Sequence, residues 1–300
     1  MNKYDLLQDK LGNDVRRDVE LAPFTTFRIG GPAKYFFKAT TPQQLLTAYD
    51  TAVGEGLKFF VLGGGSNILF ADEGFDGLII RDTCDDIIVD GSTITVQSGL
   101  WLDHLVDIAA ENSLAGLEFA AGIPGNVGGA IFGNAGAFGG SIGNVLESAV
   151  IYHPLAGVRI VDDSYFSFAY RHSRLKEEYE LILSAKLKLS SGEKGEITDK
   201  INTHRQLRRA KHPVIEGSAG SVFKNIKQPE LKPAGKLLED SGVRGMKVGG
   251  AEIFEKHCNI IVNRGEAKAA DVRHLASMMR QKVQDKFGIE LQYEITILEP

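Results

Sequence analysis

Two clusters of glycine are the residues in this chain best suited to hold a ligand. The first is Gly63-Gly64-Gly65, followed by Ser66-Asn67, and the second has nine glycines between Gly122 and Gly143. Glycine loses more conformational freedom on folding than any other residue, so such clusters need a compensating gain. A common gain is the close approach of main-chain N–H groups to an anion such as a diphosphate. We therefore expect two main-chain cradles for one extended anionic ligand.

A set of tight turns or a flexible linker is the alternative interpretation of the longer cluster. Flexible linkers are rich in glycine and small polar residues. Here, apolar side chains are interleaved with the glycines, at Ile123, Val127, Ile131, Phe132 and Phe138. The pattern therefore favours a packed ligand cradle over a linker.

Known glycine motifs match these clusters only in part. The dinucleotide-binding fingerprint needs a third glycine where Ile68 follows Gly63 and Gly65, and the pattern G-x-x-x-x-G-K-[ST] does not occur. Residues 139–143 match the G-x-S-x-G element of serine hydrolases, with Ser141 at the position of the nucleophile. No strand is predicted directly before Ser141, so a serine hydrolase is a minor alternative.

The first cluster follows a predicted strand at residues 58–62, and a predicted helix precedes that strand. Thr41 suits the helix N-cap, Pro42 suits the first helical position, and Gln44 completes a capping box. With a strand at residues 33–39, these elements form a βαβ-like unit. Ligands of α/β folds bind at the C-terminal ends of the strands, which is where this cluster lies.

Alternation and helical periodicity predict the remaining elements. A polar helix is expected from the N-terminus to about Glu20, and a glycine-rich loop at residues 121–143. The other predicted strands are 77–81, 87–89, 93–97, 149–153, 181–189, 258–262 and 289–298, with a turn at Asp90-Gly91. The other predicted helices are 100–111, 196–211, 234–240 and 269–287.

Composition excludes several classes of protein. The net charge is -5 and gives no reason to expect nucleic-acid binding. Cys84 and Cys258 are predicted to be free thiols, and the seven histidines show no metal-binding spacing, so no metal site is expected. The sequence shows no signal-peptide pattern and no apolar run of membrane length. We therefore expect a cytoplasmic protein without membrane insertion.

Several motifs, in the same order along the chain, resemble those of the UDP-N-acetylenolpyruvoylglucosamine reductase (MurB) family. The second glycine cluster resembles its flavin loop through Gly122-Ile123-Pro124-Gly125-Asn126-Val127-Gly128-Gly129-Ala130 and Asn134-Ala135-Gly136-Ala137-Phe138-Gly139. The other matching motifs are Thr25-Thr26-Phe27-Arg28-Ile29-Gly30-Gly31, Leu62 to Asn67, Tyr170-Arg171-His172-Ser173, Ser218 to Asn225, Gly249-Gly250-Ala251-Glu252 and Lys256-His257-Cys258-Asn259. The named motifs run from Thr25 to Asn259, and the resemblance as a whole spans roughly residue 20 to the C-terminus.

The resemblance implies an α+β fold with an FAD-binding domain of the vanillyl-alcohol-oxidase type. This domain is expected at residues 1–211, as two subdomains at about 20–98 and 99–211, followed by a smaller substrate-binding domain at 212–300. The short third lobe resembles the second type of the family, which lacks a substrate-covering loop. The flavin loops carry no His or Cys at an obvious position, so FAD is expected to be bound non-covalently.

The resemblance also implies the activity, which is NADPH-dependent reduction of UDP-N-acetylglucosamine enolpyruvate to UDP-N-acetylmuramate in peptidoglycan synthesis. NADPH would reduce the flavin, and the reduced flavin would then reduce the substrate. The implied cofactor-binding residues are Gly63, Gly64, Gly65, Ser66, Asn67, Gly122, Ile123, Pro124, Gly125, Asn126, Gly128, Gly129, Asn134, Ala135 and Gly136.

Three residues are the catalytic candidates. Arg171 would hold the substrate carboxylate, Ser221 would give a proton to substrate C2, and Glu294 would stabilise the developing enolate. Lys224 and Asn225 are candidates for substrate binding. Without the resemblance, these side chains would more readily be assigned to surface ion pairs, turn hydroxyls and an exposed strand.

The sequence departs from the family pattern at three positions, none of which removes a reacting group. Asn126 replaces a small hydroxyl residue, and Ile226 and Tyr293 stand where proline is common. Since Tyr293 directly precedes Glu294, the local geometry there is open. Two alternatives also stay open: another FAD oxidoreductase of the same superfamily, acting on an alcohol or hydroxy acid, and a non-catalytic protein that binds nucleotide sugars.

Overall fold

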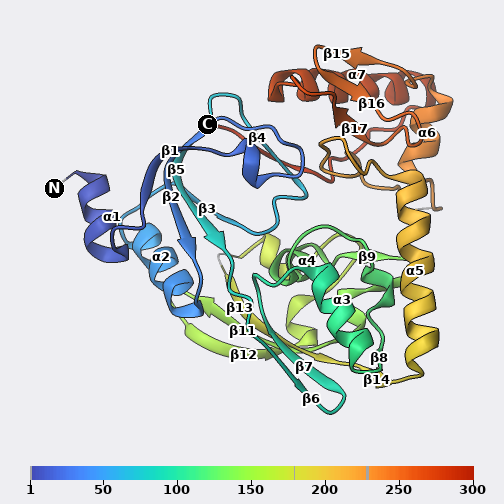
Figure 1. Ribbon diagram of the computed structural model, residues 1–300. Coiled ribbons are helices and arrows are strands. Elements are labelled where there is room, and N and C mark those ends of the chain that lie inside the picture. The colour runs from blue at the N-terminus through green and yellow to red at the C-terminus, as the bar shows by residue number, and fades with distance from the viewer. Residues whose placement is uncertain (1, 179, 228–229) are drawn as a thin grey trace. The chain divides into compact units, whose positions relative to one another are not determined.

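The computed structural model describes residues 2–178, 180–227 and 230–300 (Figure 1). Helices and sheets are mixed, as the α+β prediction requires, and the contacts divide the chain into two compact units. The first unit comprises Met1–Arg17, Tyr35–Gly64 and Gly77–Leu207, and the second comprises Asp18–Lys34, Gly65–Asp76 and Arg208–Pro300. Each unit is assembled from three segments of the chain. The division into domains at residues 1–211 and 212–300 therefore stays a prediction.

Most of a four-stranded sheet lies in the first unit, with the order β1-β2-β5-β3. The strands are β1 (Arg16–Glu20), β2 (Pro32–Ala39), β5 (Phe75–Asp82) and β3 (Phe59–Leu62). Strand β3 runs parallel to β5, which lies between β2 and β3, so the predicted βαβ-like unit is split by a later strand. Figure 1 shows α2 (Pro42–Gly54) beside these strands, and its apolar face shares a core with them.

The N-terminal helix is shorter than predicted. Helix α1 spans Lys3–Leu11, and residues 16–20 form β1 instead of its continuation. Gly12 ends the helix because it adopts a φ of 85°, and its N–H donates to the carbonyl of Gln8. The predicted start of α2 is confirmed, since the Thr41 hydroxyl accepts the N–H of Gln44, while the Gln44 side chain accepts the N–H of Thr40.

The rest of the first unit is built on a five-stranded antiparallel sheet with the order β12-β11-β13-β7-β6. Its strands are β6 (Ile87–Asp90), β7 (Thr93–Gln97), β11 (Leu146–His153), β12 (Gly157–Asp162) and β13 (Leu181–Lys188). The remaining elements include α3 (Leu102–Glu111), α5 (Lys194–Lys211), β8 (Leu114–Ala115) and β14 (Ser190–Ser191). Buried residues of α3, such as Leu105 and Val106, join the core of this sheet.

The glycine-rich segment is more ordered than the simple loop that the sequence predicts. It contains α4 (Val127–Gly133) and the short strands β9 (Gly136–Ala137) and β10 (Gly140–Ser141). Val127, Ala130 and Ile131 are buried, because their spacing places them on one face of the short helix. This apolar spacing is the signal that could have identified α4 from the sequence.

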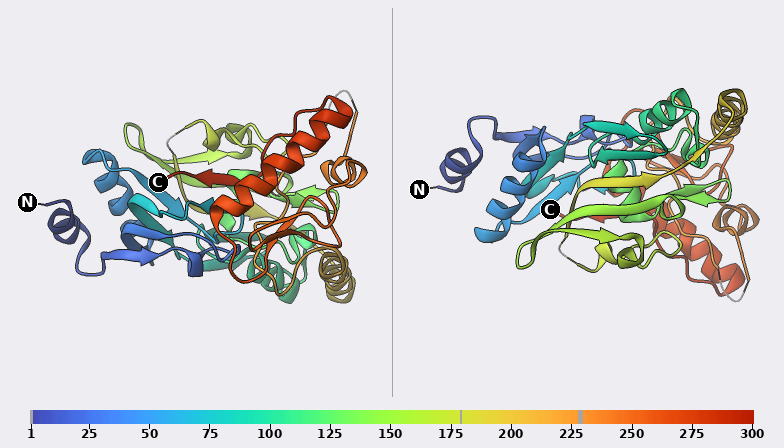
Figure 2. Two further views of the ribbon diagram at one scale, coloured as in Figure 1. Left: turned by 90° about the horizontal axis from the view of Figure 1, so that it is seen from above. Right: turned by 90° about the horizontal axis from the view of Figure 1, so that it is seen from below.

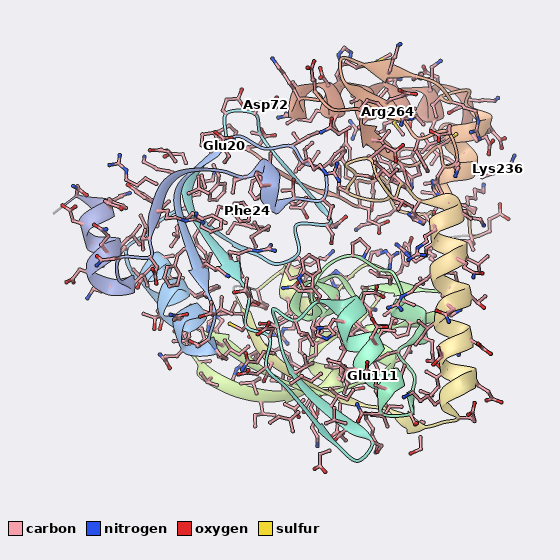
Figure 3. All side chains as sticks on the ribbon, viewed as in Figure 1. Glu20, Phe24, Asp72, Glu111, Lys236 and Arg264 are labelled. Atoms are coloured by element: carbon pink, nitrogen blue, oxygen red, sulfur yellow. The ribbon has the colours of Figure 1, made fainter. Side chains whose placement is uncertain are left out.

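The second unit is organised around a small antiparallel sheet of β15 (Lys247–Val248), β16 (Ala251–Ile253) and β17 (Ile261–Asn263). Helix α7 (Ala269–Phe287) packs on this sheet, as Figure 2 shows, and buries Val272, Leu275 and Met279 in a shared core with α6 (Ala234–Asp240). The Asp72 carboxylate, labelled in Figure 3, accepts the first N–H groups of α7, from Ala269 and Ala270. This side chain therefore caps the helix.

The C-terminal strand is shorter than predicted. Only β18 (Thr296–Leu298) is regular, and it pairs in parallel with β4 (Ile68–Phe70). The residues before β18 leave the strand because their main chain binds another segment, where the Lys224 N–H donates to the carbonyl of Gln292. Among the described residues, no helix combines the length and apolar character that crossing a membrane requires.

Candidate functional site

The two glycine clusters meet in the first unit. A Cβ atom on Gly64 would lie 2.5 Å from the Cα of Gly125, and one on Gly63 would lie 2.3 Å from Oδ1 of Asn126. Both separations are shorter than any real carbon contact. At Gly64 the obstacle is main chain, which excludes a side chain, whereas at Gly63 it is the side chain of Asn126. Glycine is therefore required at Gly64 for the packing of one turn on the other, in addition to any approach of a ligand.

Four main-chain N–H groups at this meeting point form no hydrogen bond to the described part of the chain. They belong to Gly63, Gly64, Gly125 and Asn126, and the last three residues are buried. Buried N–H groups almost always find an acceptor in a folded protein, in a water molecule or in a ligand. The turns therefore bring several available donors close together, and such a group suits an anion with several oxygen atoms.

A cavity of about 70 Å³ has three of these four residues, Gly63, Gly64 and Asn126, in its wall. Arg81 and Asp82, at the end of β5, also line it. Burial raises the pKa of the Asp82 carboxyl and lowers the pKa of the Arg81 guanidinium. Neither residue was predicted from the sequence, although two charged residues directly after the apolar run Leu78-Ile79-Ile80 are a recognisable signal.

The side chain of Asn126 has a structural role that a small hydroxyl residue could also fill. Its side chain is the N-cap of α4, because Oδ1 accepts the N–H of Gly129 at 3.0 Å. Serine, threonine and asparagine all cap helices in this way, so asparagine preserves the function of a small hydroxyl residue. The same side chain fills the space beside Gly63.

The segment around Arg171 is bound to the second glycine cluster at three points. The Arg171 guanidinium donates to the carbonyl of Gly136 at 3.0 Å, and the Ser173 hydroxyl donates to the carbonyl of Phe132 at 2.7 Å. Asn134 donates from Nδ2 to the carbonyl of Ala169 at 2.9 Å. Arg171 adopts a positive φ of 55°, which is uncommon for a residue with a side chain and marks a constrained position. The structure thus brings Arg171 to the predicted flavin loop.

Other predicted cofactor-binding residues in this segment have structural partners. The Gly122 N–H donates to the Asp103 carboxylate at 2.7 Å, and the Gly128 N–H donates to the carbonyl of Ser98. Ser141 stands at the N-cap position of a short 3-10 turn, and its N–H and hydroxyl both donate to Oδ1 of Asn144, at 2.8 and 3.0 Å. These bonds account for Ser141 without a hydrolase mechanism.

In the second unit, main-chain hydrogen bonds bring Glu294 beside the serine loop. The Glu294 N–H donates to the carbonyl of Val222, which follows Ser221, at 2.8 Å. Nδ2 of Asn67, at the end of the first glycine cluster, donates to the Glu294 carbonyl at 3.0 Å. Asn67, Ser221 and Glu294 therefore lie in one hydrogen-bonded region.

Tyr293 has a packing role that replaces proline. Its ring stacks on that of Phe223, with the centroids 5.1 Å apart, and the two residues are bridge partners in the main chain. This contact fixes the chain immediately before Glu294. The geometry that the sequence left open at this position is therefore well supported.

The serine loop is held on both sides. The Val222 N–H donates to the carbonyl of Asn259, whose side chain exchanges two hydrogen bonds with the main chain of Phe223. On the other side, the Thr26 hydroxyl donates to the carbonyl of Ser218 at 2.7 Å. Thr26 belongs to the N-terminal motif, so this motif supports the loop that carries Ser221.

The two predicted substrate-binding residues follow this loop. The Lys224 N–H donates to the carbonyl of Gln292, and Oδ1 of Asn225 accepts the N–H of Ala234 at 3.0 Å. Nearby, Nδ1 of His257 accepts the N–H of Asn259 at 3.2 Å, and burial lowers the pKa of His257. Burial also lowers the pKa of His212 to about 4. These histidines are therefore neutral, structural groups near neutral pH.

Comparisons with known proteins agree with this geometry. Residues 33–159 match the model of an FAD-binding domain, and residues 212–298 match the C-terminal domain of UDP-N-acetylenolpyruvoylglucosamine reductase. Enzymes with the latter name from Caldicellulosiruptor bescii and Clostridium perfringens are 40% and 35% identical, and their alignments cover 99% of this chain and 94% and 99% of the relatives.

A solved structure shows the same fold. The enzyme from Thermus caldophilus, titled UDP-N-acetylenolpyruvylglucosamine reductase, superposes with a TM-score of 0.81 over 94% of this chain and 99% of its own, at 32% identity. The FAD-binding match and the reductase relatives define the chain as an FAD-containing oxidoreductase. More specifically, the chain belongs to the UDP-N-acetylenolpyruvoylglucosamine reductase family.

Proposed function

We propose that this chain reduces UDP-N-acetylglucosamine enolpyruvate to UDP-N-acetylmuramate with NADPH, through non-covalently bound FAD. The observation that carries most weight is the meeting of two glycine turns around four buried or half-buried N–H donors, inside the region that matches an FAD-binding domain. Membership of the reductase family supports the choice of substrate. Because a UDP-linked sugar and NADPH are both metabolites of the cytoplasm, we infer that the enzyme works there.

The two glycine clusters would hold the cofactor. FAD, when bound, supplies hydride transfer between NADPH and the substrate. The protein contributes main-chain donors at Gly63, Gly64, Gly125 and Asn126. These donors can lie close together because Gly64 has no side chain, so that its turn packs directly on Gly125. The full set proposed for FAD binding is Gly63, Gly64, Gly65, Ser66, Asn67, Gly122, Ile123, Pro124, Gly125, Asn126, Gly128, Gly129, Asn134, Ala135 and Gly136.

Arg171 would bind the substrate carboxylate. A guanidinium presents a planar fork that matches the two oxygens of a carboxylate. Its hydrogen bond to the Gly136 carbonyl fixes the orientation of that fork next to the predicted flavin loop. The positive charge would also stabilise the negative charge that develops beside the carboxylate when a hydride adds to the double bond.

Ser221 would give the proton that completes the reaction at substrate C2. A hydroxyl is a weak acid, but an enolate is a strong base, so transfer is favourable once that charge has formed. The main chain on both sides of Ser221 is fixed by its bridge to Ile260 and by the Val222–Asn259 bond. Glu294 would stabilise the enolate from the neighbouring segment, and Lys224 and Asn225 would contact the rest of the substrate.

The spectrum of the purified protein tests this function. We expect flavin absorbance in the visible range, bleaching when NADPH is added under anaerobic conditions, and recovery when the enolpyruvyl sugar follows. Mass spectrometry of the product should then show UDP-N-acetylmuramate. A colourless protein would favour a nucleotide-sugar binding protein, and recovery with an alcohol or hydroxy-acid couple alone would favour another FAD oxidoreductase.

A further inference from the structure

Arg81 stands at an unusual position for a charged residue. It is the last residue but one of β5, and Leu78, Ile79 and Ile80 before it are fully buried. The parallel register places Arg81 opposite Leu62, directly before the first glycine turn. In a parallel pair, residues in register point to the same face of the sheet. Arg81 therefore lies on the side of the sheet where this turn begins.

The Arg81 guanidinium is incompletely satisfied by the protein. Its Nη1 atom is buried and has no hydrogen-bond partner in the part of the chain that the structure describes. The neighbouring Asp82 is the nearest compensating charge, but its Oδ1 accepts the N–H of Cys84 at 3.0 Å. A buried cation with an unmade hydrogen bond is costly, so the position calls for an acceptor that the described protein atoms do not provide.

The cavity beside Arg81 is suited to supply that acceptor. Its volume of about 70 Å³ admits a group the size of a few water molecules, and Gly63, Gly64 and Asn126 also form its wall. The buried groups at this cavity without a hydrogen-bond partner in the described part of the chain are Nη1 of Arg81 and the main-chain N–H groups of Gly64 and Asn126, and all of them are donors. The complementary ligand is a small group with several acceptor oxygens and a negative charge.

We propose that Arg81 binds a phosphate oxygen of the FAD diphosphate, in the cavity that it shares with Gly63, Gly64 and Asn126. This inference rests on the proposed use of FAD and adds a side chain to a cradle otherwise made of main chain. Arginine suits the position because its several N–H groups form charge-assisted bonds with phosphate. The carboxylates of Asp82 and Asp85 also line the cavity and repel an anion. Phosphate binding at this cavity would therefore depend on the positive charge of Arg81.

The test compares Arg81→Met, Arg81→Lys and a matched control, Lys38→Met. Lys38 is an exposed cation on β2 of the same sheet, away from the cavity. Each full-length variant is stripped of flavin, and the FAD dissociation constant and the melting temperature of the flavin-free protein are measured. We expect Arg81→Met to raise the FAD dissociation constant about tenfold to a hundredfold, Arg81→Lys to raise it less, and Lys38→Met to leave it unchanged.

The melting temperature separates phosphate binding from a structural role. Arg81→Met should leave the melting temperature of the flavin-free protein close to that of the unaltered protein, because the loss of the attraction to Asp82 is offset by the removal of a buried charge with an unmade hydrogen bond. An unchanged FAD dissociation constant would overturn the proposal. Weaker binding accompanied by a lower flavin-free melting temperature would also overturn it and assign Arg81 to the fold. If the unaltered protein failed to bind FAD at all, the proposed function itself would be wrong.

Discussion

The glycine turns of the first unit and the serine loop of the second unit present their functional groups in opposite ways. Around Gly63, Gly64 and Gly125, the functional groups are main-chain N–H donors, and a side chain at Gly64 is excluded because it would overlap the main chain of Gly125. Around Ser221 and Glu294, the functional groups are side chains, and main-chain hydrogen bonds serve only to hold them.

This difference determines which kind of substitution impairs the function of each region. A main-chain cradle is damaged when atoms are added, because the loops are already in contact. A side-chain site is damaged when atoms are removed, because the scaffold survives and only the reacting group is lost. The first kind of change should therefore abolish cofactor binding, and the second should leave the cofactor in place while slowing the chemistry.

The largest expected effect is that of Gly64→Ala. The new Cβ would lie 2.5 Å from the Cα of Gly125, a main-chain atom that cannot move aside without displacing the whole turn. We expect loss of nearly all bound FAD, together with about 1–3 kcal/mol less stability, the usual range for overpacking. The flavin-to-protein absorbance ratio and urea denaturation measure these two effects.

Gly133→Ala is the matched control, because a Cβ atom at this position, the end of α4, would have no neighbouring atom within 4 Å. It should retain FAD and stabilise the protein slightly, by about 0.4–1 kcal/mol. Full flavin content in Gly64→Ala would show that the turns can separate, and the contrast between the two regions would then fail.

The next effect is that of Ser221→Ala in the serine loop. FAD content and the reduction of FAD by NADPH should remain close to those of the unaltered protein, whereas reoxidation by the substrate should slow by about 10²- to 10⁴-fold. Stopped-flow absorbance resolves the two half-reactions. Ser218→Ala is the control, since its hydroxyl accepts the N–H of Gly220 within the same loop. Equal slowing of both half-reactions would remove Ser221 from the role of proton donor.

The sequence predicted the long elements well because their patterns are local. The apolar face of α7 and the Thr41 cap are encoded by neighbouring residues, and the structure confirms them. The predicted hairpin is also present, but its two turn residues are Gly91 and Ser92, one residue later than predicted, because Asp90 pairs with Thr93. Interactions between distant segments are harder to predict. The predicted strand at 289–298 is mostly absent from the described structure because the main chain of Gln292 and Glu294 binds the serine loop.

The candidate site was predictable only in part, for a related reason. The motifs pointed to both glycine clusters, but not to the fact that the second cluster leaves no room for a side chain at Gly64 of the first. Arg81 was missed because its significance depends on the parallel register with Leu62, which pairs segments from two different strands. Asn126 was recognised as a departure from the family pattern, yet its role as the cap of α4 required the helix to be seen first.

Arg171 tests whether the difference between main-chain and side-chain function follows the division into units. It belongs to the same unit as the glycine turns but would act through its side chain. Arg171→Lys keeps the charge and loses the planar fork. We expect FAD binding to be unchanged and the second half-reaction to slow about tenfold to a hundredfold, as expected when a charge-assisted hydrogen bond of about 1.5–3 kcal/mol is lost. The KM for the enolpyruvyl sugar and the rate of flavin reoxidation report this loss.

Arg174→Lys is the control for Arg171, because Arg174 lies three residues away and pairs with the exposed Glu178. It should leave both half-reactions unchanged. If Arg171→Lys instead lost FAD, the residue would belong with the cofactor cradle, and its bond to the Gly136 carbonyl would be the reason.

The smallest effect concerns Asn126, where main chain and side chain both contribute. Asn126→Ala removes the cap of α4 and should reduce the free energy of unfolding by about 1 kcal/mol, while Asn126→Ser should retain most of it. Urea denaturation of both variants measures the difference. Since the Asn126 N–H is present in either variant, FAD affinity should fall only as far as the turn loosens. A large loss of FAD affinity in Asn126→Ser, with stability retained, would mean that the side chain itself contacts the cofactor, and that the cradle is not built from main chain alone.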